Sequence, residues 1–390
     1  MKRLWSFGLV VVFASGAAWA AALLPDPAVK PGETAAQPGD MPAPAGLTLD
    51  KESYPVTDGS TSAEPLGVWV AARLLGLECA WRSSMFEAQR RLLPMNPGHK
   101  EVAALYGARL RHHGTHGAYT RLINGAADLI YECRPPSPDE AKLMEERGVE
   151  LEIVPIALDA FVFLRHRENP IAELTSEQVR DIYTRSEEGE RGRIDNWNRV
   201  GGPDARINAY VRNPNSGSQE TLKTLVMKDR EIVQGRDMMG RTMMGPYNLM
   251  QKDKNGIGFT FFYYQRYMAP LSYGSHASAP KALAEVQDEK VEEQPVEMFA
   301  IDGVQPSRET IADGSYPWVT KVYAVTRKDL APDHPAARLR AWLLTEEGRK
   351  IIAETGYVTP AETVPTLVPK LSRMDESEIT AHGDEGVGPE

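Results

Sequence analysis

The sequence predicts an α/β protein built from two lobes. Short apolar runs alternate with stretches in which apolar residues recur at helical spacing, a pattern typical of layered α/β folds. The length of 390 residues is enough for two domains that each have a core. One apolar stretch, residues 149–164 around Asp159, is too long for an ordinary strand. We expect it to leave one sheet and enter another.

The N-terminal segment, residues 1–20, predicts a signal peptide. Lys2 and Arg3 precede a largely apolar run, and Ala18 and Ala20 are small residues at the positions that a signal peptidase reads. The apolar run is shorter than the about 20 residues that a membrane-spanning helix needs. A membrane anchor is the alternative. We expect an exported, periplasmic protein.

Composition divides the rest of the chain. Residues 21–47 are rich in Pro and Ala and predict a tether, whereas residues 371–390 are acidic and predict a disordered tail. No internal repeat is present. In the body we expect the first lobe at 48–158 and 321–370, and the second lobe at 159–320.

The expected elements follow the periodicity of apolar residues and the capping residues Ser137 and Thr175. Helices are expected at 63–75, 102–110, 119–123, 138–147, 175–183, 216–227 and 336–353. Strands are expected at 74–77, 129–131, 149–164, 206–211, 256–262 and 318–326.

Charge and motifs exclude several classes of protein. The chain has 44 Lys and Arg against 54 Asp and Glu, a formal net charge of −10, which excludes a general nucleic-acid binder. It contains no Gly-x-Ser-x-Gly, Walker A or His-Glu-x-x-His motif. Ser278 and Lys281 have Ser-x-x-Lys spacing, but Pro280 stands where the nucleophile helix has to continue. We expect a non-enzyme that needs no cofactor, with a serine hydrolase as a minor alternative.

The most informative stretch predicts an anion site at the start of a helix. An expected strand ends at Arg212, and after a short turn a helix opens with Ser216, Gly217 and Ser218. The first turn of a helix has unbonded N–H groups and a partial positive charge. Arg212 adds a fork that matches two oxygens of an oxyanion. An ordinary helix cap is the alternative interpretation.

Two further helix starts have the same character. Hydroxyl residues Ser60, Thr61 and Ser62 precede one expected helix, and Thr115 lies in a Gly-Thr-His-Gly stretch before another. Three such starts in one α/β body predict that the helix N-termini converge on a single anion. The acidic net charge is compatible with this site because fixed local dipoles act at short range.

The order and spacing of these pieces resemble the periplasmic phosphate-binding subunits of ABC importers, which have a type II periplasmic-binding-protein fold. The resemblance covers nearly the whole body, through the motifs Asp58-Gly59-Ser60-Thr61, Ile123-Asn124-Gly125-Ala126-Ala127-Asp128, Asn196-Trp197 with Gly201-Gly202, Arg212 with Ser216-Gly217-Ser218, Gly256-Ile257-Gly258 and Gly356-Tyr357-Val358. It implies two lobes that are joined by two crossings and close over the anion.

The resemblance also implies which residues bind. It places Thr61 and Ser62 as first-lobe donors, with Ser62 departing from the usual Phe, and it places Thr115 on a family Ser. The second-lobe residues that match are Arg212, Ser216, Gly217 and Ser218.

One position departs from the family. Its phosphate binders have an Asp after the strand that follows Asp128, which accepts a hydrogen bond from the protonated anion. Here Glu132 could accept that bond, or Arg134 could add positive charge instead. The ligand class is therefore expected to be an inorganic oxyanion, with phosphate first.

Cys79 and Cys133 have two interpretations. In an oxidising compartment they could form a disulfide, and otherwise they are two small buried residues. They lack the Cys-x-x-Cys spacing of a redox or zinc site.

Other candidates weigh less. His112 and His116 have the spacing of a metal pair in a basic cluster with His113, but we see no third ligand and interpret the cluster as a solvated helix end. Asp159 is expected to cap the backbone or pair locally rather than to act as a functional acid. Four methionines are interpreted as core or lobe-facing residues rather than a soft-metal site: Met238, Met239, Met243 and Met244.

The favoured function is capture of an oxyanion and its delivery to an ABC permease in the inner membrane by a monomeric solute-binding protein. The alternative is a periplasmic anion sensor or envelope protein that signals to a membrane partner.

Overall fold

The computed structural model describes residues 42–83, 90–94, 100–186, 192–214, 216–233, 239–240, 243–268 and 295–359. The predicted signal peptide, most of the predicted tether, the predicted tail and the Ser278 to Lys281 stretch lie outside these residues.

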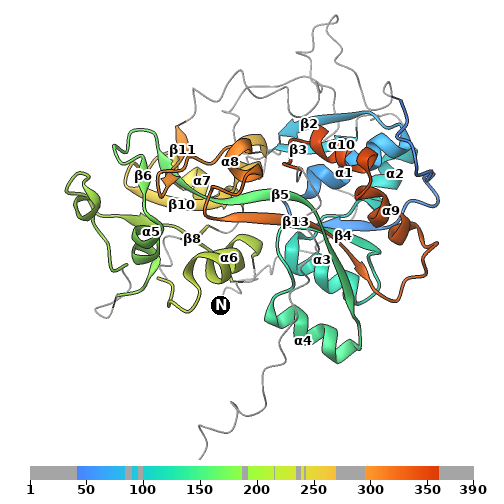
Figure 1. Cartoon of the computed structure of the whole chain (residues 1–390), viewed down its shortest axis with the longest axis horizontal. Coiled ribbons are helices and arrows are strands. Elements are labelled where there is room, and N and C mark those ends of the chain that lie inside the picture. The colour runs from blue at the N-terminus through green and yellow to red at the C-terminus, as the bar shows by residue number, and fades with distance from the viewer. Residues whose placement is uncertain are drawn as a thin grey trace, which may run out of the picture.

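A seven-stranded mixed sheet runs through the molecule (Figure 1). Its strand order is β1-β4-β13-β5-β10-β7, and β11 also pairs with β5. The strands are β1 (Thr57–Gly59), β4 (Leu129–Glu132), β5 (Leu151–His166), β7 (Asn208–Ala209), β10 (Gly256–Phe261), β11 (Val296–Met298) and β13 (Val319–Arg327).

The long strand β5 is shared by the two lobes, as its length and composition predict. Residues 151–160 pair antiparallel with β13, and residues 161–166 pair with β10 and β11. Figure 1 shows β5 and β13 crossing from one half of the molecule to the other. The predicted lobe boundaries at 158/159 and 320/321 remain predictions, and both fall on adjacent pairs of the β5–β13 ladder, Asp159 with Thr320 and Leu158 with Lys321.

The first lobe, on the right of Figure 1, contains β1, β4, β13 and the first part of β5 with six helices among the described residues. The helices are α1 (Glu64–Leu75), α2 (Lys100–Arg109), α3 (Gly114–Ile123), α4 (Pro138–Arg147), α9 (Pro335–Leu343) and α10 (Glu346–Glu354). An antiparallel pair, β2 (Cys79–Ser83) and β3 (Arg90–Pro94), completes this lobe.

Two local predictions in this lobe are wrong. The strand expected at 74–77 does not form, because Leu74 and Leu75 continue α1 until Gly76 ends the helix with φ +62°. The helix expected at 119–123 begins earlier, at Gly114. By contrast, α4 has the predicted bounds, and Ser137 caps it together with Glu140.

The second lobe contains β7, β10, β11 and the rest of β5, with four α-helices among its described residues. The helices are α5 (Ser176–Tyr183), α6 (Gly217–Thr221), α7 (Met244–Met250) and α8 (Arg308–Ala312). Two short parallel pairs flank them, β6 (Glu173–Leu174) with β12 (Ala300–Ile301) and β8 (Val211–Arg212) with β9 (Met239–Gly240). The strand expected at 206–211 is therefore divided into β7 and β8, and the helix expected at 216–227 continues from α6 as a π-helical turn.

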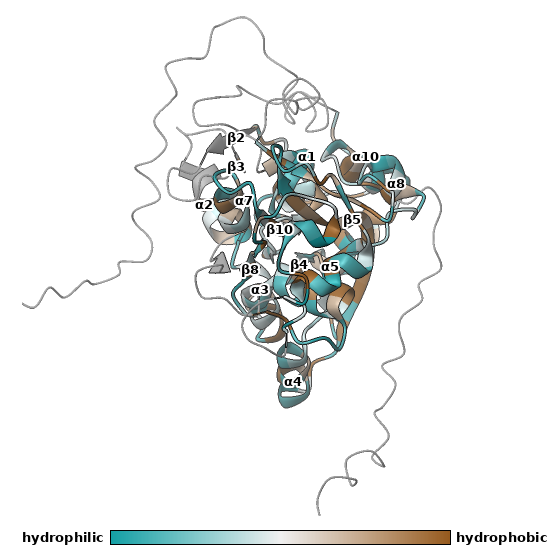
Figure 2. Cartoon of the chain, turned by 90° about the vertical axis from the view of Figure 1, so that its left-hand side faces the viewer, coloured by the Kyte–Doolittle hydropathy of each residue, from teal (hydrophilic) through white to brown (hydrophobic). Residues whose placement is uncertain are grey.

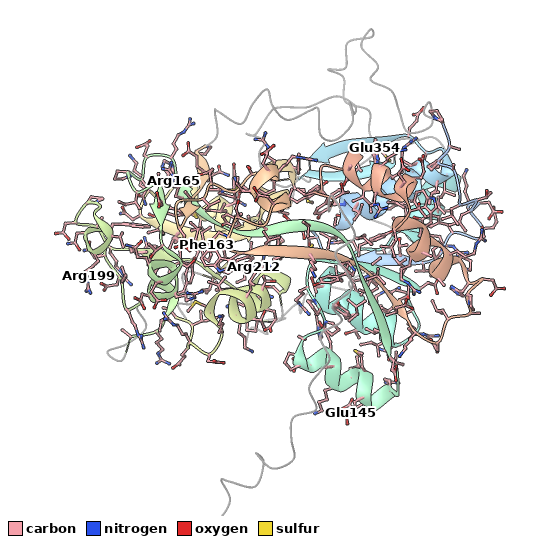
Figure 3. The ribbon with its side chains drawn as sticks, in the orientation of Figure 1. Glu145, Phe163, Arg165, Arg199, Arg212 and Glu354 are labelled. Carbon is pink, nitrogen blue, oxygen red and sulfur yellow. The ribbon has the colours of Figure 1, made fainter. Side chains whose placement is uncertain are left out.

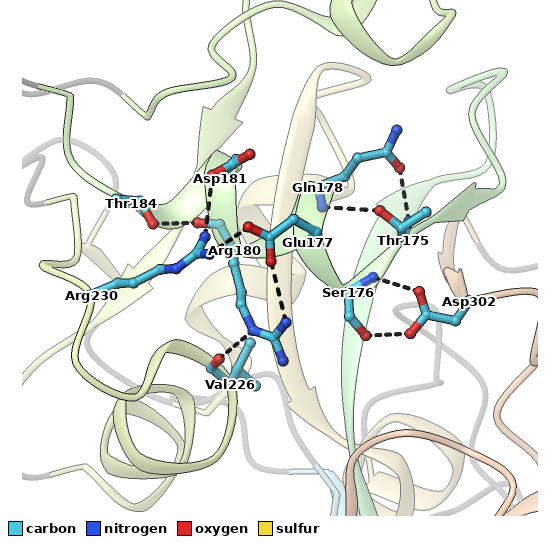
Figure 4. Close-up of polar contacts among 10 residues, drawn as sticks. All are labelled: Thr175, Ser176, Glu177, Gln178, Arg180, Asp181, Thr184, Val226, Arg230 and Asp302. Carbon is cyan, nitrogen blue, oxygen red and sulfur yellow. Dashed lines mark hydrogen bonds and ion pairs between the residues drawn. The ribbon is translucent and has the colours of Figure 1, made fainter.

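Helix α5 illustrates a local prediction that the structure confirms. Thr175 Oγ1 accepts the N–H of Gln178 at 3.1 Å, and Gln178 Oε1 accepts the N–H of Thr175 at 2.8 Å (Figure 4). The same view shows Arg230 paired with Glu177 in the first turn of the helix. These contacts fix the start of α5 beside the sheet of the second lobe.

Aromatic side chains form the core where β5 enters the second lobe. Phe161 and Phe163 on β5 pack edge to face, with centroids 5.7 Å apart, and both contact Phe259 on β10. Trp318, just before β13, packs on Phe163 with ring centroids 5.2 Å apart. Figure 2 shows the hydrophobic colouring concentrated on strands such as β5, with hydrophilic residues on the outer helix α4. This packing stabilises the part of β5 that lies in the second lobe.

The last residues of the predicted tether lie against the first lobe. Leu47 is buried in the core, Trp342 Nε1 donates to the carbonyl of Ala45 at 2.8 Å, and Arg73 reaches the carbonyl of Pro42 at 3.3 Å. Among the described residues, no helix has the length and apolar character needed to cross a membrane.

Candidate functional site

The hydroxyl residues before α1 lie at the end of β1, where the two parallel strands β1 and β4 approach closely. A β-carbon at Gly59 would be 2.4 Å from the carbonyl oxygen of Tyr131, so only glycine fits there. The N–H of Ser60 donates to that same carbonyl at 3.0 Å. This contact fixes the loop in which Ser60, Thr61 and Ser62 precede the helix.

Cys133 faces this loop. Ser62 Oγ lies 3.1 Å from Cys133 Sγ, and Ser60 Oγ donates to the same sulfur at 3.7 Å. Burial raises the pKa of Cys133 to about 12, so the group is a neutral thiol at neutral pH. Cys79 is also buried, and both cysteines are thiols rather than partners in a disulfide. The structure therefore agrees with the interpretation of Cys79 and Cys133 as two small buried residues.

The loop is also held from the far end of the chain. Tyr357 donates its hydroxyl proton to the carbonyl oxygen of Ser62 at 2.7 Å, and its ring stacks on Tyr263 with centroids 3.9 Å apart. Tyr263 follows β10 of the second lobe, so this stack links the lobes beside the α1 start.

The starts of α3 and α6 meet between the lobes. A β-carbon added at Gly217 would lie 2.6 Å from Thr115 Oγ1, closer than real contacts allow. The backbone of α6 at Gly217 therefore touches the Thr115 side chain. Because α3 belongs to the first lobe and α6 to the second, two of the three predicted helix starts converge.

Arg212 and Ser218 complete the second-lobe half. Arg212 ends β8, is 7% exposed, and its Nη1 lies 3.4 Å from Ser218 Oγ. The backbone N–H of Arg212 donates to Gln219 Oε1 at 2.8 Å. The backbone N–H of Gln219 in turn donates to Ser216 Oγ, the cap of α6, at 3.2 Å. Figure 3 shows Arg212 in the middle of the molecule, between the two halves. Burial lowers the pKa of Arg212 to about 10, which leaves it cationic at neutral pH.

Glu132 lies on the opposite side of β4 from Cys133, as the alternation of side chains along a strand requires. It is fully buried, and neither carboxylate oxygen has a hydrogen-bond partner among the described residues. Burial raises the pKa of Glu132 well above its usual value, although Arg134 acts in the opposite direction. This shift favours the neutral form of Glu132, and its predicted part in binding the anion stays a prediction.

Arg134 is engaged away from the loop before α1. Its guanidinium forms a fork with Glu140, with Nη–Oε distances of 2.7 and 2.8 Å, and also donates to the carbonyl of Pro135. Burial alone would raise the pKa of Glu140, and the Arg134 fork lowers it below its usual range. The structure thus gives Arg134 a role in fixing the start of α4.

The three histidines have separate partners. His112 Nε2 lies 3.0 Å from Thr61 Oγ1, His113 Nδ1 lies 2.6 Å from Asp58 Oδ2, and His116 Nδ1 lies 3.1 Å from Glu140 Oε1. No group of His, Cys, Asp and Glu among the described residues is arranged to hold a metal ion. The contact between His112 and Thr61 connects this cluster to the site and was missed from the sequence.

Asp159 lies at the crossing of β5. Its Oδ1 accepts the N–H groups of Ala160 and Tyr263 at 2.8 and 3.0 Å, in agreement with the predicted backbone cap. Its Oδ2 is buried and has no partner among the described residues. Burial raises the pKa of Asp159 to about 7. Of the four methionines, Met244 is in the core and Met243 packs against it, while the side chains of Met238 and Met239 lie outside the described residues.

This arrangement is suited to binding an anion. It presents hydroxyl and backbone donors from both lobes and one buried cation.

Comparison with known proteins finds relatives of this chain. A family model described as a PBP superfamily domain matches residues 99–346. A phosphate-binding protein PstS from Staphylococcus epidermidis is 25% identical over 263 residues, 66% of this chain and 72% of its own length. A PstS from Staphylococcus saprophyticus is 24% identical over 63% of this chain and 69% of its own length. A Clostridium perfringens protein described as a phosphate ABC transporter substrate-binding protein, solved with bound phosphate, superposes with a TM-score of 0.51 at 20% identity, covering 80% of this chain and 99% of its own.

Proposed function

This chain belongs to the PBP superfamily, and from that premise we propose that it captures an inorganic oxyanion, phosphate first, outside the cytoplasm and delivers it to an ABC permease. The names of the similar proteins support phosphate as the ligand and transport as the context.

One observation carries the proposal. The backbone of Gly217 in the second lobe lies against Thr115 Oγ1 in the first lobe, beside the buried pair of Arg212 and Ser218. Donors from the two lobes therefore lie together at one place, and a cation accompanies them. Tetrahedral oxyanions offer the several acceptor oxygens that such a group of donors can satisfy.

The proposed mechanism changes no covalent bond. The anion exchanges its hydration for hydroxyl and N–H donors of Thr115, Ser216 and Ser218, and Arg212 compensates its charge. Donors from both lobes are together only when the lobes are in contact, so the anion favours that state over an open one. A permease that recognises the closed form would then receive the loaded protein.

Export and a monomeric state belong to the same proposal. Lys2, Arg3 and the apolar run after them support export, because they have the composition of a cleaved leader. Delivery to a permease requires a protein that reaches the outer face of the membrane, which a leader of this kind provides.

A ligand screen of the full chain tests the proposal. The melting temperature is measured with phosphate, arsenate, sulfate and molybdate, and the dissociation constant follows from titration calorimetry. A ligand that binds the native state alone raises the melting temperature by mass action. We expect the largest rise with phosphate or arsenate. An unchanged melting temperature with all four anions would contradict oxyanion capture.

A further inference from the structure

His112 is placed to control one of the donors in the first lobe. It lies between α2 and α3, three residues before Thr115, and its Nε2 is 3.0 Å from Thr61 Oγ1. The contact joins residues that are 51 positions apart, so it is set by the fold. His112 is partly buried, whereas the side chains of His113 and His116 are 42% and 48% exposed.

A hydroxyl group has one proton to donate and two lone pairs that accept. When His112 is neutral with its proton on Nδ1, Nε2 accepts the Thr61 proton, and that proton is no longer available to a ligand. When His112 is protonated, Nε2–H must donate to Thr61 Oγ1, and the hydroxyl proton is directed elsewhere. Relative to the neutral ring with its proton on Nδ1, the charged ring therefore leaves the Thr61 proton available to an anion.

The charged groups around His112 have contacts of their own, and none of these contacts replaces the one between His112 and Thr61. On β1, Asp58 accepts from His113 at 2.6 Å and from Arg121 Nε of α3 at 2.9 Å, so its charge is shared by those two groups. On α1, Glu64 accepts from the Tyr106 hydroxyl at 3.2 Å. At the end of α2, Arg109 donates to the carbonyl of Glu52 at 2.8 Å. Arg111 lines a small cavity with Asp58 and Glu64.

We propose that His112 is a positioning residue that acts through Thr61, and that its protonation strengthens oxyanion binding as the pH falls. This inference rests on the proposed function, because it concerns the affinity of the same site. His112 makes no covalent change to the ligand, and its proton exchanges with solvent.

The experiment is calorimetric titration of the full chain with inorganic phosphate at about pH 6 and about pH 8, on either side of the usual histidine pKa. The variants are His112→Leu, Thr61→Val, the double variant, and His116→Leu as the matched control from the same segment. Phosphate itself ionises in this range, so each dissociation constant is divided by that of the wild type at the same pH. Melting temperatures without phosphate verify that each variant is folded.

For His112→Leu we expect the ratio to the wild type to rise about five- to tenfold between about pH 8 and about pH 6. In the Thr61→Val background, the same substitution should change the ratio less than about twofold. His116→Leu should follow the wild type. A second measurement uses NMR of the histidine rings at a fixed pH, in which phosphate should shift the His112 ring signals of the wild type towards those of a protonated ring, because the coupling is reciprocal. This measurement needs no variant.

The outcomes separate the two proposals. If phosphate binds the wild type but the His112→Leu ratio is equal at both pH values, and the His112 ring signals do not respond to phosphate, the inference is wrong and the proposed function stands. If the effect of His112→Leu persists fully with Thr61→Val, the route through Thr61 is wrong. If the wild type binds no phosphate at either pH, the proposed phosphate site fails and the inference fails with it.

Discussion

The two halves of the candidate site are built in different ways. In the second lobe, Arg212, Ser216 and Ser218 lie within seven residues, on one strand, one turn and one helix start. In the first lobe, Ser62, Cys133 and Thr115 come from three segments that the sheet brings together. The second half contains the buried cation Arg212, while the first contains hydroxyl donors, neighbouring histidines and the ion pair of Arg134 with Glu140. The cation of the site thus comes from the half built by sequence neighbours, and the histidines lie in the half assembled by topology.

The largest expected effect tests whether Arg134 is structural, as its fork with Glu140 indicates. Arg134→Met leaves the buried Glu140 carboxylate without its cation, and we expect a loss of about 3 to 5 kcal/mol in the free energy of unfolding. Urea denaturation measures this loss. Phosphate affinity of the folded variant should change less than about threefold. A large loss of affinity with unchanged stability would instead assign Arg134 to the ligand.

Arg212→Ala should weaken phosphate binding by about 2 to 4 kcal/mol, because it removes a charge-assisted fork from a buried place. Calorimetry measures the change. Arg199→Ala is the matched control, since Arg199 is exposed in the same lobe (Figure 3). Near-equal affinities of the two variants would show that the positive charge of Arg212 is not used for binding.

Asp159 lies between the two halves and should make stability depend on pH. Burial raises its pKa in the folded state to about 7, above the unfolded value, so the neutral acid is the form that the folded protein favours. Its contribution is fully present below the unfolded pKa and is lost as the pH rises through about 7. Between about pH 5 and about pH 8 the wild type should lose about 2 to 3 kcal/mol relative to Asp159→Asn.

Urea denaturation at both pH values measures that difference. The exposed Asp333→Asn serves as the control and should follow the wild type. If the free energy of unfolding changed equally with pH in the wild type and in Asp159→Asn, the buried carboxyl would not change its charge in this range.

The smallest expected effect concerns the contact between the halves. Gly217→Ala introduces a β-carbon against Thr115 Oγ1, and we expect phosphate binding to weaken by about 1 to 2 kcal/mol because the lobes can no longer meet fully. Gly107→Ala on α2 is the control, since a β-carbon there meets no neighbour within 4 Å. Unchanged affinity for Gly217→Ala would show that the observed contact is not required in the bound state.

The same division explains what could be predicted from the sequence. Capping at Thr175, the bounds of α4 and the turn after Arg212 depend on neighbours in sequence, and local patterns were sufficient for them. The long apolar run was recognised as a shared strand because ordinary strands are shorter. The contact of His112 with Thr61 and the position of Cys133 against Ser62 depend on which strands become neighbours, so residue spacing contained no signal for them.

The Tyr357 contact has a consequence for how the chain matures during synthesis. The first strand of the first lobe, β1, begins at Thr57, yet the sheet lacks β13 between β4 and β5 until residue 327 is made. The loop before α1 lacks its Tyr357 hydrogen bond for 30 residues more. The second lobe needs no strand beyond β11 and β12. The lobe that a ribosome starts first is therefore completed last. In a nascent chain shorter than 357 residues, only the second lobe can have all of its described strands and the contacts within the lobe.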